Sequence, residues 1–97
     1  MTLDEFRATL SSDRSPAVAP ALVALWHDAR GDWDKAHELA NDVDDRTGAW
    51  VHAYLHRKEG DLGNAAYWYD RAGQPVPSDG LDAEWDRIAT ALLGRHR

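Results

Sequence analysis

The chain has 97 residues, carries a net charge of −6 and contains no cysteine. A chain of this length forms one domain, and the lack of cysteine excludes disulfides and thiolate metal sites. Nucleic acids and anionic membranes attract basic surfaces, so the acidic balance predicts that neither is a partner. Apolar residues make up 43% of the chain, which favours a packed core over disorder.

The two halves of the chain differ in charge. Residues 1–48 carry ten acidic and five basic residues, whereas residues 49–97 carry seven and six. The N-terminal segment lacks the basic start and apolar run of a signal peptide, and no stretch approaches the roughly 20 apolar residues that span a bilayer. We therefore expect a cytoplasmic protein.

Two helices are predicted in the N-terminal third. The first covers about residues 2–11, because Thr2 and Glu5 have the spacing of a capping box ahead of an apolar stripe. The second covers about residues 16–30, because a Ser-Pro pair at its start suits the N-cap and the first helical position. A glycine ends this second helix.

Four more helices are predicted in the remainder, and no segment shows the alternation typical of a strand. Asp32 is a suitable N-cap for the first of them, and residues 45–48 form a turn before the next. The predicted ranges are about 33–44, 49–59, 62–72 and 80–93. The sequence therefore predicts a single all-α domain, residues 1–97, of about six helices.

An internal repeat organises the middle of the chain. The Gly31-Asp32 pair recurs as Gly60-Asp61, 29 residues later. At the same offset, Ala24 matches Ala53, His27 matches His56 and Ala36 matches Ala65. Each copy reads helix, Gly-Asp, helix, so we expect two hairpins that stack to bury their apolar faces.

These residues resemble the tetratricopeptide repeats. Ala53 and Ala65 match the small pair that packs between the two helices of that repeat, and Gly60 matches its inter-helix glycine. Later positions of the repeat are matched by Tyr69, Ala72 and Pro77. The resemblance covers about residues 17–77, as copies over 17–45 and 46–77. It implies stacked hairpins sealed by a helix at each end.

Two features depart from the family pattern. The offset of 29 residues is shorter than the usual length of about 34. His52 and His56 stand where the family commonly has leucine and tyrosine. The short offset puts the usual superhelical curvature in question.

The resemblance implies a protein- or peptide-binding function and no cofactor. Its concave groove would be lined by one face of the fourth helix, which carries Trp50, Tyr54, Arg57 and Lys58. Aromatic rings beside an arginine are typical of binding hot spots. The alternative is that both rings pack against the preceding repeat and the cations are solvated.

A second hypothesis is a small metal-dependent or acid–base enzyme. His52, His56 and Glu59 stand at i, i+4 and i+7, so all three project from one helix face at a spacing that suits zinc. The competing interpretation places both histidines in the seam between paired helices, where hydrogen bonds satisfy their ring nitrogens. The histidine at the matching position of the first copy favours that structural interpretation.

A third hypothesis is a homodimeric structural protein. Tyr67, Trp68 and Tyr69 are consecutive, so their side chains lie about 100° apart around a helix. We therefore expect at least one of these rings to be exposed or to lie in an interface.

Overall fold

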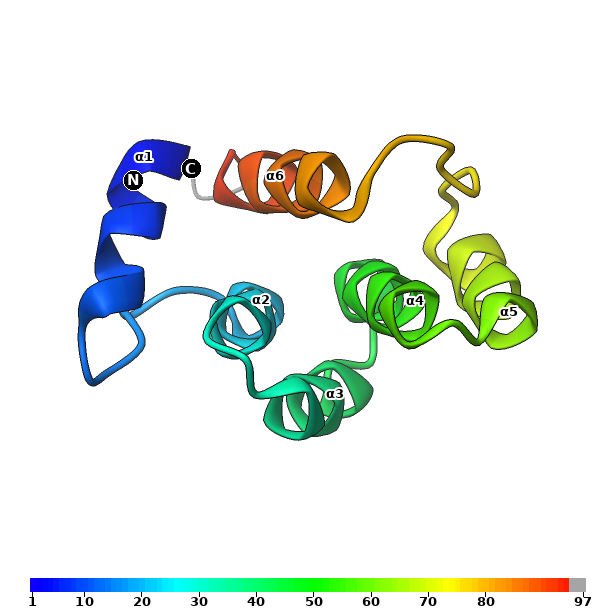
Figure 1. Ribbon diagram of the computed structural model, residues 1–97, viewed down its shortest axis with the longest axis horizontal. Helices are drawn as coiled ribbons and strands as arrows, with labels where there is room; N and C mark the ends of the chain where they lie inside the picture. Colours follow the sequence, from blue (N-terminus) through cyan, green and yellow to red (C-terminus); the bar gives the residue numbers. More distant parts are fainter. Residues whose placement is uncertain (95–97) are drawn as a thin grey trace.

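Six α-helices and one short 3₁₀ turn follow one another over residues 1–94 (Figure 1). A computed structural model of the protein describes residues 1–94. The elements are α1 (Leu3–Ala8), η1 (Thr9–Ser11), α2 (Pro20–Ala29), α3 (Trp33–Asp42), α4 (Arg46–Glu59), α5 (Leu62–Ala72) and α6 (Leu81–Leu93). Residues 1–94 contain no strand, which confirms the all-α prediction. No helix in this range has the length and apolar character needed to cross a membrane.

The predicted capping box at the start of α1 is confirmed. The Thr2 hydroxyl accepts the Glu5 N–H at 3.1 Å, and the Glu5 carboxylate accepts the Thr2 N–H at 2.8 Å. The regular α-helix ends at Ala8, and the rest of the predicted segment continues as the 3₁₀ turn η1.

The predicted start of α2 at residue 16 is wrong, because the helix begins at Pro20. A proline at this point of a longer helix would lack an N–H donor and would clash with the carbonyl four residues before it. Proline also disfavours the helical conformation of the residue before it, and Ala19 is extended, with φ −56° and ψ 148°. Pro20 therefore occupies the first helical position itself.

The segment predicted as a turn at residues 45–48 is mostly the first turn of α4. The Asp45 carboxylate accepts the N–H groups of Thr47 and Gly48 at 2.9 and 3.1 Å, so this aspartate is the N-cap. Gly48 is required there, because a Cβ atom would lie 2.1 Å from the carbonyl oxygen of Val43. The prediction for α5 is correct at both ends.

The two Gly-Asp corners have nearly the same geometry. Gly31 and Gly60 have φ values of 86° and 90°, in the left-handed region that favours glycine. The next residue in each corner donates its N–H to a histidine carbonyl, Asp32 to His27 and Asp61 to His56, both at 3.0 Å. The two aspartate carboxylates then cap α3 and α5.

Helix α6 closes the core by packing across both α2 and α4 (Figure 1). Its Trp85 donates the indole N–H to the Leu25 carbonyl at 3.1 Å. The Trp85 ring also stacks on Phe6 of α1, with ring centres 5.7 Å apart. Fully buried alanines, Ala24 and Ala53, lie on the two central helices, where small side chains allow close packing.

Candidate functional site

The four residues predicted to line a groove lie on the side of α4 that faces α2 and α6. The Trp50 and Tyr54 rings are 7% and 3% exposed. Arg57 and Lys58 form ion pairs with α6 and α2 respectively. The chain therefore buries both rings of this face itself, whereas Lys58 stays exposed, and both cations are paired with carboxylates of neighbouring helices and not merely solvated.

Arg57 is held by a buried carboxylate. It donates to Glu84 of α6 at 2.8 Å, and the Glu84 side chain is fully buried. The hydroxyl of Tyr69 on α5 donates to the same carboxylate. Glu84 thereby joins three helices, and its charge is balanced by the guanidinium.

Lys58 and Tyr54 share a second buried carboxylate, that of Asp28 on α2. The Lys58 ammonium lies 2.9 Å from it, and the Tyr54 hydroxyl donates to it at 3.2 Å. Burial raises the pKa of Tyr54 well above its ordinary value, and the negative charge of Asp28 raises it further. The hydroxyl therefore stays protonated and keeps donating.

A cavity of about 520 Å³ lies beside this second carboxylate, between the α1–η1 segment and helices α2, α4 and α6. Tyr54 and Lys58 contribute to its wall, and Leu10 and Trp85 give it apolar surface. Asp82 also lines the cavity, and among residues 1–94 no cation pairs with it. The cavity thus combines apolar walls with one free carboxylate.

A smaller cavity of about 330 Å³ lies on the other side of the covered face. Trp50 lines it together with the segment at residues 74–79 and Arg87, which is paired with Asp79 at 2.5 Å. The predicted groove residues therefore line different cavities: Trp50 lines this one, and Tyr54 and Lys58 line the larger one.

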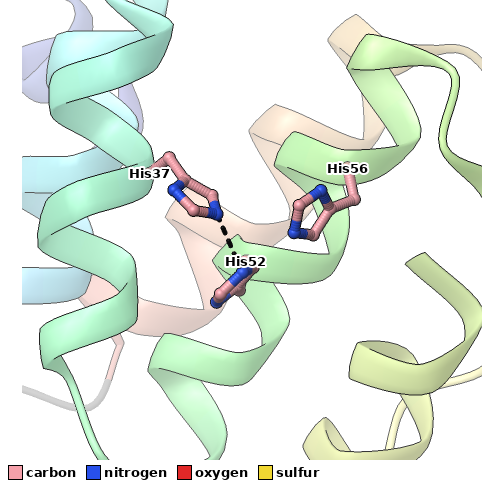
Figure 2. Close-up of side chains that lie close together, drawn as sticks. All are labelled: His37, His52 and His56. Carbon is pink, nitrogen blue, oxygen red and sulfur yellow. Dashed lines mark hydrogen bonds between the residues drawn. The ribbon is translucent and has the colours of Figure 1, made fainter. Parts of the chain in front are cut away.

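Three histidines converge in the seam between α3 and α4 (Figure 2). The Nε2 atoms of His37 and His52 are 3.1 Å apart. Ring centres are separated by 4.6 Å for His37–His52, 5.1 Å for His37–His56 and 4.7 Å for His52–His56. Each histidine offers one ring nitrogen as a potential metal ligand, and these three nitrogens all lie within 4.8 Å of one another. His52 and His56 are buried, and His37 is partly exposed.

The predicted trio of His52, His56 and Glu59 does not form a three-ligand cluster within the part of the chain that the structure describes. The Glu59 carboxylate instead lies 2.5 Å from Nδ1 of His56, and these two residues form a second possible ligand group with Asp61. Nε2 of His56 faces the amide of Asn64 at 3.3 Å. His37 therefore takes the place that the sequence interpretation gave to Glu59.

Two tryptophans fix the orientation of the histidine rings. His37 stacks on Trp33 with ring centres 4.9 Å apart, and His52 stacks on Trp68 at 3.9 Å. Trp33 is itself anchored, because its indole N–H donates to the Leu55 carbonyl at 2.9 Å. These contacts limit the rotation of both imidazoles.

The cluster favours uncharged imidazoles. Burial lowers the pKa of His52 to about 4, and the neighbouring His37 and His56 add to the shift. The pKa of His37 is also lowered, chiefly by burial and then by His56. At neutral pH both rings therefore retain a lone pair for a hydrogen bond or a metal ion.

The three consecutive aromatic residues of α5 have different environments. Tyr67 is 54% exposed, which confirms the prediction that at least one of these rings is exposed. Tyr69 is buried against Glu84 of α6, and Trp68 is partly buried against His52.

The chain matched no protein-family model, no curated protein and no solved structure in the three comparisons made with known proteins.

Proposed function

We propose that the protein is a small tetratricopeptide-like module in which α2–α3 and α4–α5 stack as repeats between capping helices α1 and α6. The matching Gly-Asp corners support this assignment, because they repeat a left-handed glycine, a backbone hydrogen bond and a capping aspartate at one offset. Fully or nearly fully buried alanines at matching positions also fit a repeated helix–helix contact. The function that accompanies this architecture is binding of a partner protein.

The binding place we propose is the 520 Å³ cavity beside Tyr54 and Lys58. The observation that carries the proposal is that two of the four residues predicted to line a groove, Tyr54 and Lys58, line this cavity. Trp50 and Arg57 do not. It holds both apolar surface and a free carboxylate, Asp82, in the first turn of α6. Small binding sites are typically concave and mostly apolar, with a few polar groups that fix orientation.

The apolar surface and the Asp82 carboxylate of the cavity wall favour a lysine or arginine side chain of a partner peptide. The ion pairs Arg7–Asp86 and Lys58–Asp28 balance their own charges, so Asp82 leaves the cavity with a net negative charge. The aliphatic stem of a long basic side chain can lie on apolar wall while its charged head reaches the carboxylate. The overall charge of −6 further attracts a basic partner.

A displayed library of random peptides, followed by fluorescence anisotropy on synthetic hits, tests this function. We expect the selected peptides to share a lysine or arginine, and its replacement by methionine to weaken binding by about tenfold or more, the equivalent of 1.4 kcal/mol. Asp82→Asn should weaken binding similarly. Asp70→Asn, on the exposed side of α5, is the matched control and should leave affinity unchanged.

Selection of no peptide, or affinity that is indifferent to Asp82→Asn, would contradict the proposed cavity. Light scattering on the same samples measures the molar mass in solution and so tests whether the chain forms a dimer. A chain that is dimeric in solution, with Tyr67→Ser restoring the monomer, would favour the homodimer hypothesis over partner binding.

A further inference from the structure

We propose that His37, His52 and His56 form a binding site for a divalent transition-metal ion of the zinc type, with three imidazole nitrogens as protein ligands. The site joins α3 of the first hairpin to α4 of the second. The inference is independent of the peptide-binding proposal, because none of the three histidines lines the 520 Å³ cavity.

The spacing of the three rings is close to what tetrahedral zinc requires. With Zn–N bonds of about 2.05 Å, two ligand nitrogens lie ~3.3 Å apart and the centres of their rings ~5 Å apart. The observed Nε2–Nε2 distance between His37 and His52 is 3.1 Å. The ring-centre distances span 4.6–5.1 Å and the three ligand nitrogens lie within 4.8 Å of one another, so metal binding draws these nitrogens together by at most ~1.5 Å.

A hydrogen bond sets the tautomer of His56. Its Nδ1 lies 2.5 Å from the Glu59 carboxylate, so the proton belongs on Nδ1 and the lone pair on Nε2. A carboxylate that accepts the far N–H of a ligating imidazole is the usual second layer of a zinc site, because it orients the ring and raises its basicity. Glu59 would thus act as a positioning residue and not as a ligand.

Metal binding changes two hydrogen bonds. In the metal-free cluster, one of His37 and His52 donates Nε2–H to the other. When both nitrogens ligate the metal, that proton moves to Nδ1 of the same ring, so the imidazole stays neutral. The Asn64 amide must also leave Nε2 of His56, and its partly exposed side chain has room to turn toward solvent.

The surroundings suit a transition metal better than calcium or magnesium. Imidazole nitrogen is a ligand for zinc, copper and nickel, whereas the alkaline-earth ions prefer oxygen. Burial keeps His37 and His52 uncharged at neutral pH, so the metal need not displace protons from them. Partial exposure of His37 gives the ion a route to the cluster.

Titration of chelator-treated protein with Zn²⁺, followed by calorimetry near neutral pH, tests the site. We expect one ion per chain, and a loss of affinity well beyond tenfold in His37→Ala and in His56→Ala. Glu59→Gln should weaken binding by about 10- to 100-fold, as loss of a second-layer partner does. His27→Ala is the matched control, because His27 is the repeat equivalent of His56 but lies outside the cluster.

Circular dichroism of each variant shows whether it remains folded, and His37→Ala removes the most exposed of the three rings. Co²⁺ gives a second readout that does not depend on stability. Its visible absorption should be that of a four-coordinate ion in the unmodified protein and in His27→Ala, and that of the hydrated ion in His37→Ala. Absence of Zn²⁺ binding, or binding that persists in both His37→Ala and His56→Ala, overturns the proposal, as does an equal loss in His27→Ala.

Discussion

Arg57 of α4 and Glu84 of α6 form an ion pair in the interior, with nitrogen and oxygen 2.8 Å apart and the glutamate side chain fully buried. The sequence placed Arg57 on an open binding face. The structure places it in a contact that attaches the last helix to the centre of the molecule. A cation predicted to bind a partner therefore binds the protein's own α6.

Removal of Glu84 should destabilise the fold strongly. Glu84→Ala leaves the Arg57 guanidinium partly buried without its counter-charge and deprives the Tyr69 hydroxyl of its acceptor. Loss of one member of a buried pair costs about 3–5 kcal/mol. Urea unfolding followed by circular dichroism should show this decrease in the free energy of unfolding.

Asp86→Ala is the control for that measurement. Asp86 lies on the same helix and pairs with Arg7, but both side chains are substantially exposed, at 35% and 48%. An exposed pair contributes about 1 kcal/mol or less. Comparable losses in the two variants would contradict the distinction between a buried and a surface pair.

The stability of the protein should fall as pH rises above about 10. Burial raises the pKa of Tyr54 and of Tyr69 in the folded state, and the neighbouring carboxylates Asp28 and Glu84 add to these shifts. Above the unfolded value of 10.0, the unfolded chain releases protons that the folded chain retains, so deprotonation favours unfolding. Each tyrosine can contribute a slope of at most about 1.4 kcal/mol per pH unit.

Tyrosinate absorbance, recorded with circular dichroism during an alkaline titration, checks this pH dependence. The absorbance of ionised Tyr54 and Tyr69 should appear at the same pH at which the circular dichroism signal of the helices is lost. Tyr69→Phe should lower stability at neutral pH but make its decline above pH 10 shallower, because one titrating group is gone. Ionisation of both tyrosines while the helices remain intact would disprove the linkage.

Alanine at either Gly-Asp corner should cost a similar amount of stability. Gly31 and Gly60 share a left-handed conformation, and a Cβ atom at either would meet no neighbouring atom within 4 Å. The cost is therefore that of backbone conformation alone, about 1–2 kcal/mol for each. Thermal or urea unfolding of Gly31→Ala and Gly60→Ala measures it, and a large difference between them would show that the corners are not equivalent.

Two other glycines should respond in opposite ways. Gly80 is the N-cap of α6, has an extended backbone and open space around it, and offers no side chain to cap the helix. Gly80→Ser should raise the free energy of unfolding by about 0.5–1 kcal/mol through capping and a less flexible unfolded chain.

Gly48→Ala should lower the free energy of unfolding by about 1–3 kcal/mol, because its Cβ would overlap the Val43 carbonyl.

Features that depend on neighbouring residues were predictable from the sequence. The capping box at Thr2 and the Gly-Asp corners each involve groups within a few positions of one another, and the structure has them as expected. The exceptions are the starts of two helices: residues 45–48 resembled a turn but begin α4, and the pair at Ser15 and Pro16 resembled the start of α2. Pro20 decided the boundary, because it excludes the helical conformation just before it.

Features that depend on how helices pack were not predictable in the same way. The spacing of His52 and His56 was visible on one helix, but His37 joins them only because α3 packs against α4. No periodicity within residues 49–59 carries that information. Likewise, the pattern of residues 81–93 does not distinguish Glu84 from the other polar residues of α6, and only the packing of α6 across α4 shows its buried pairing.

The stacking of Phe6 on Trp85 has a consequence for synthesis in the cell. These rings are far apart in the sequence, yet they meet at the junction of α1 and α6. While a ribosome is still making α6, the apolar faces of α1, α2 and α4 remain uncovered in the nascent chain. The apolar surfaces that α6 covers are therefore buried only after residues 81–93 have been synthesised and have folded onto α2 and α4.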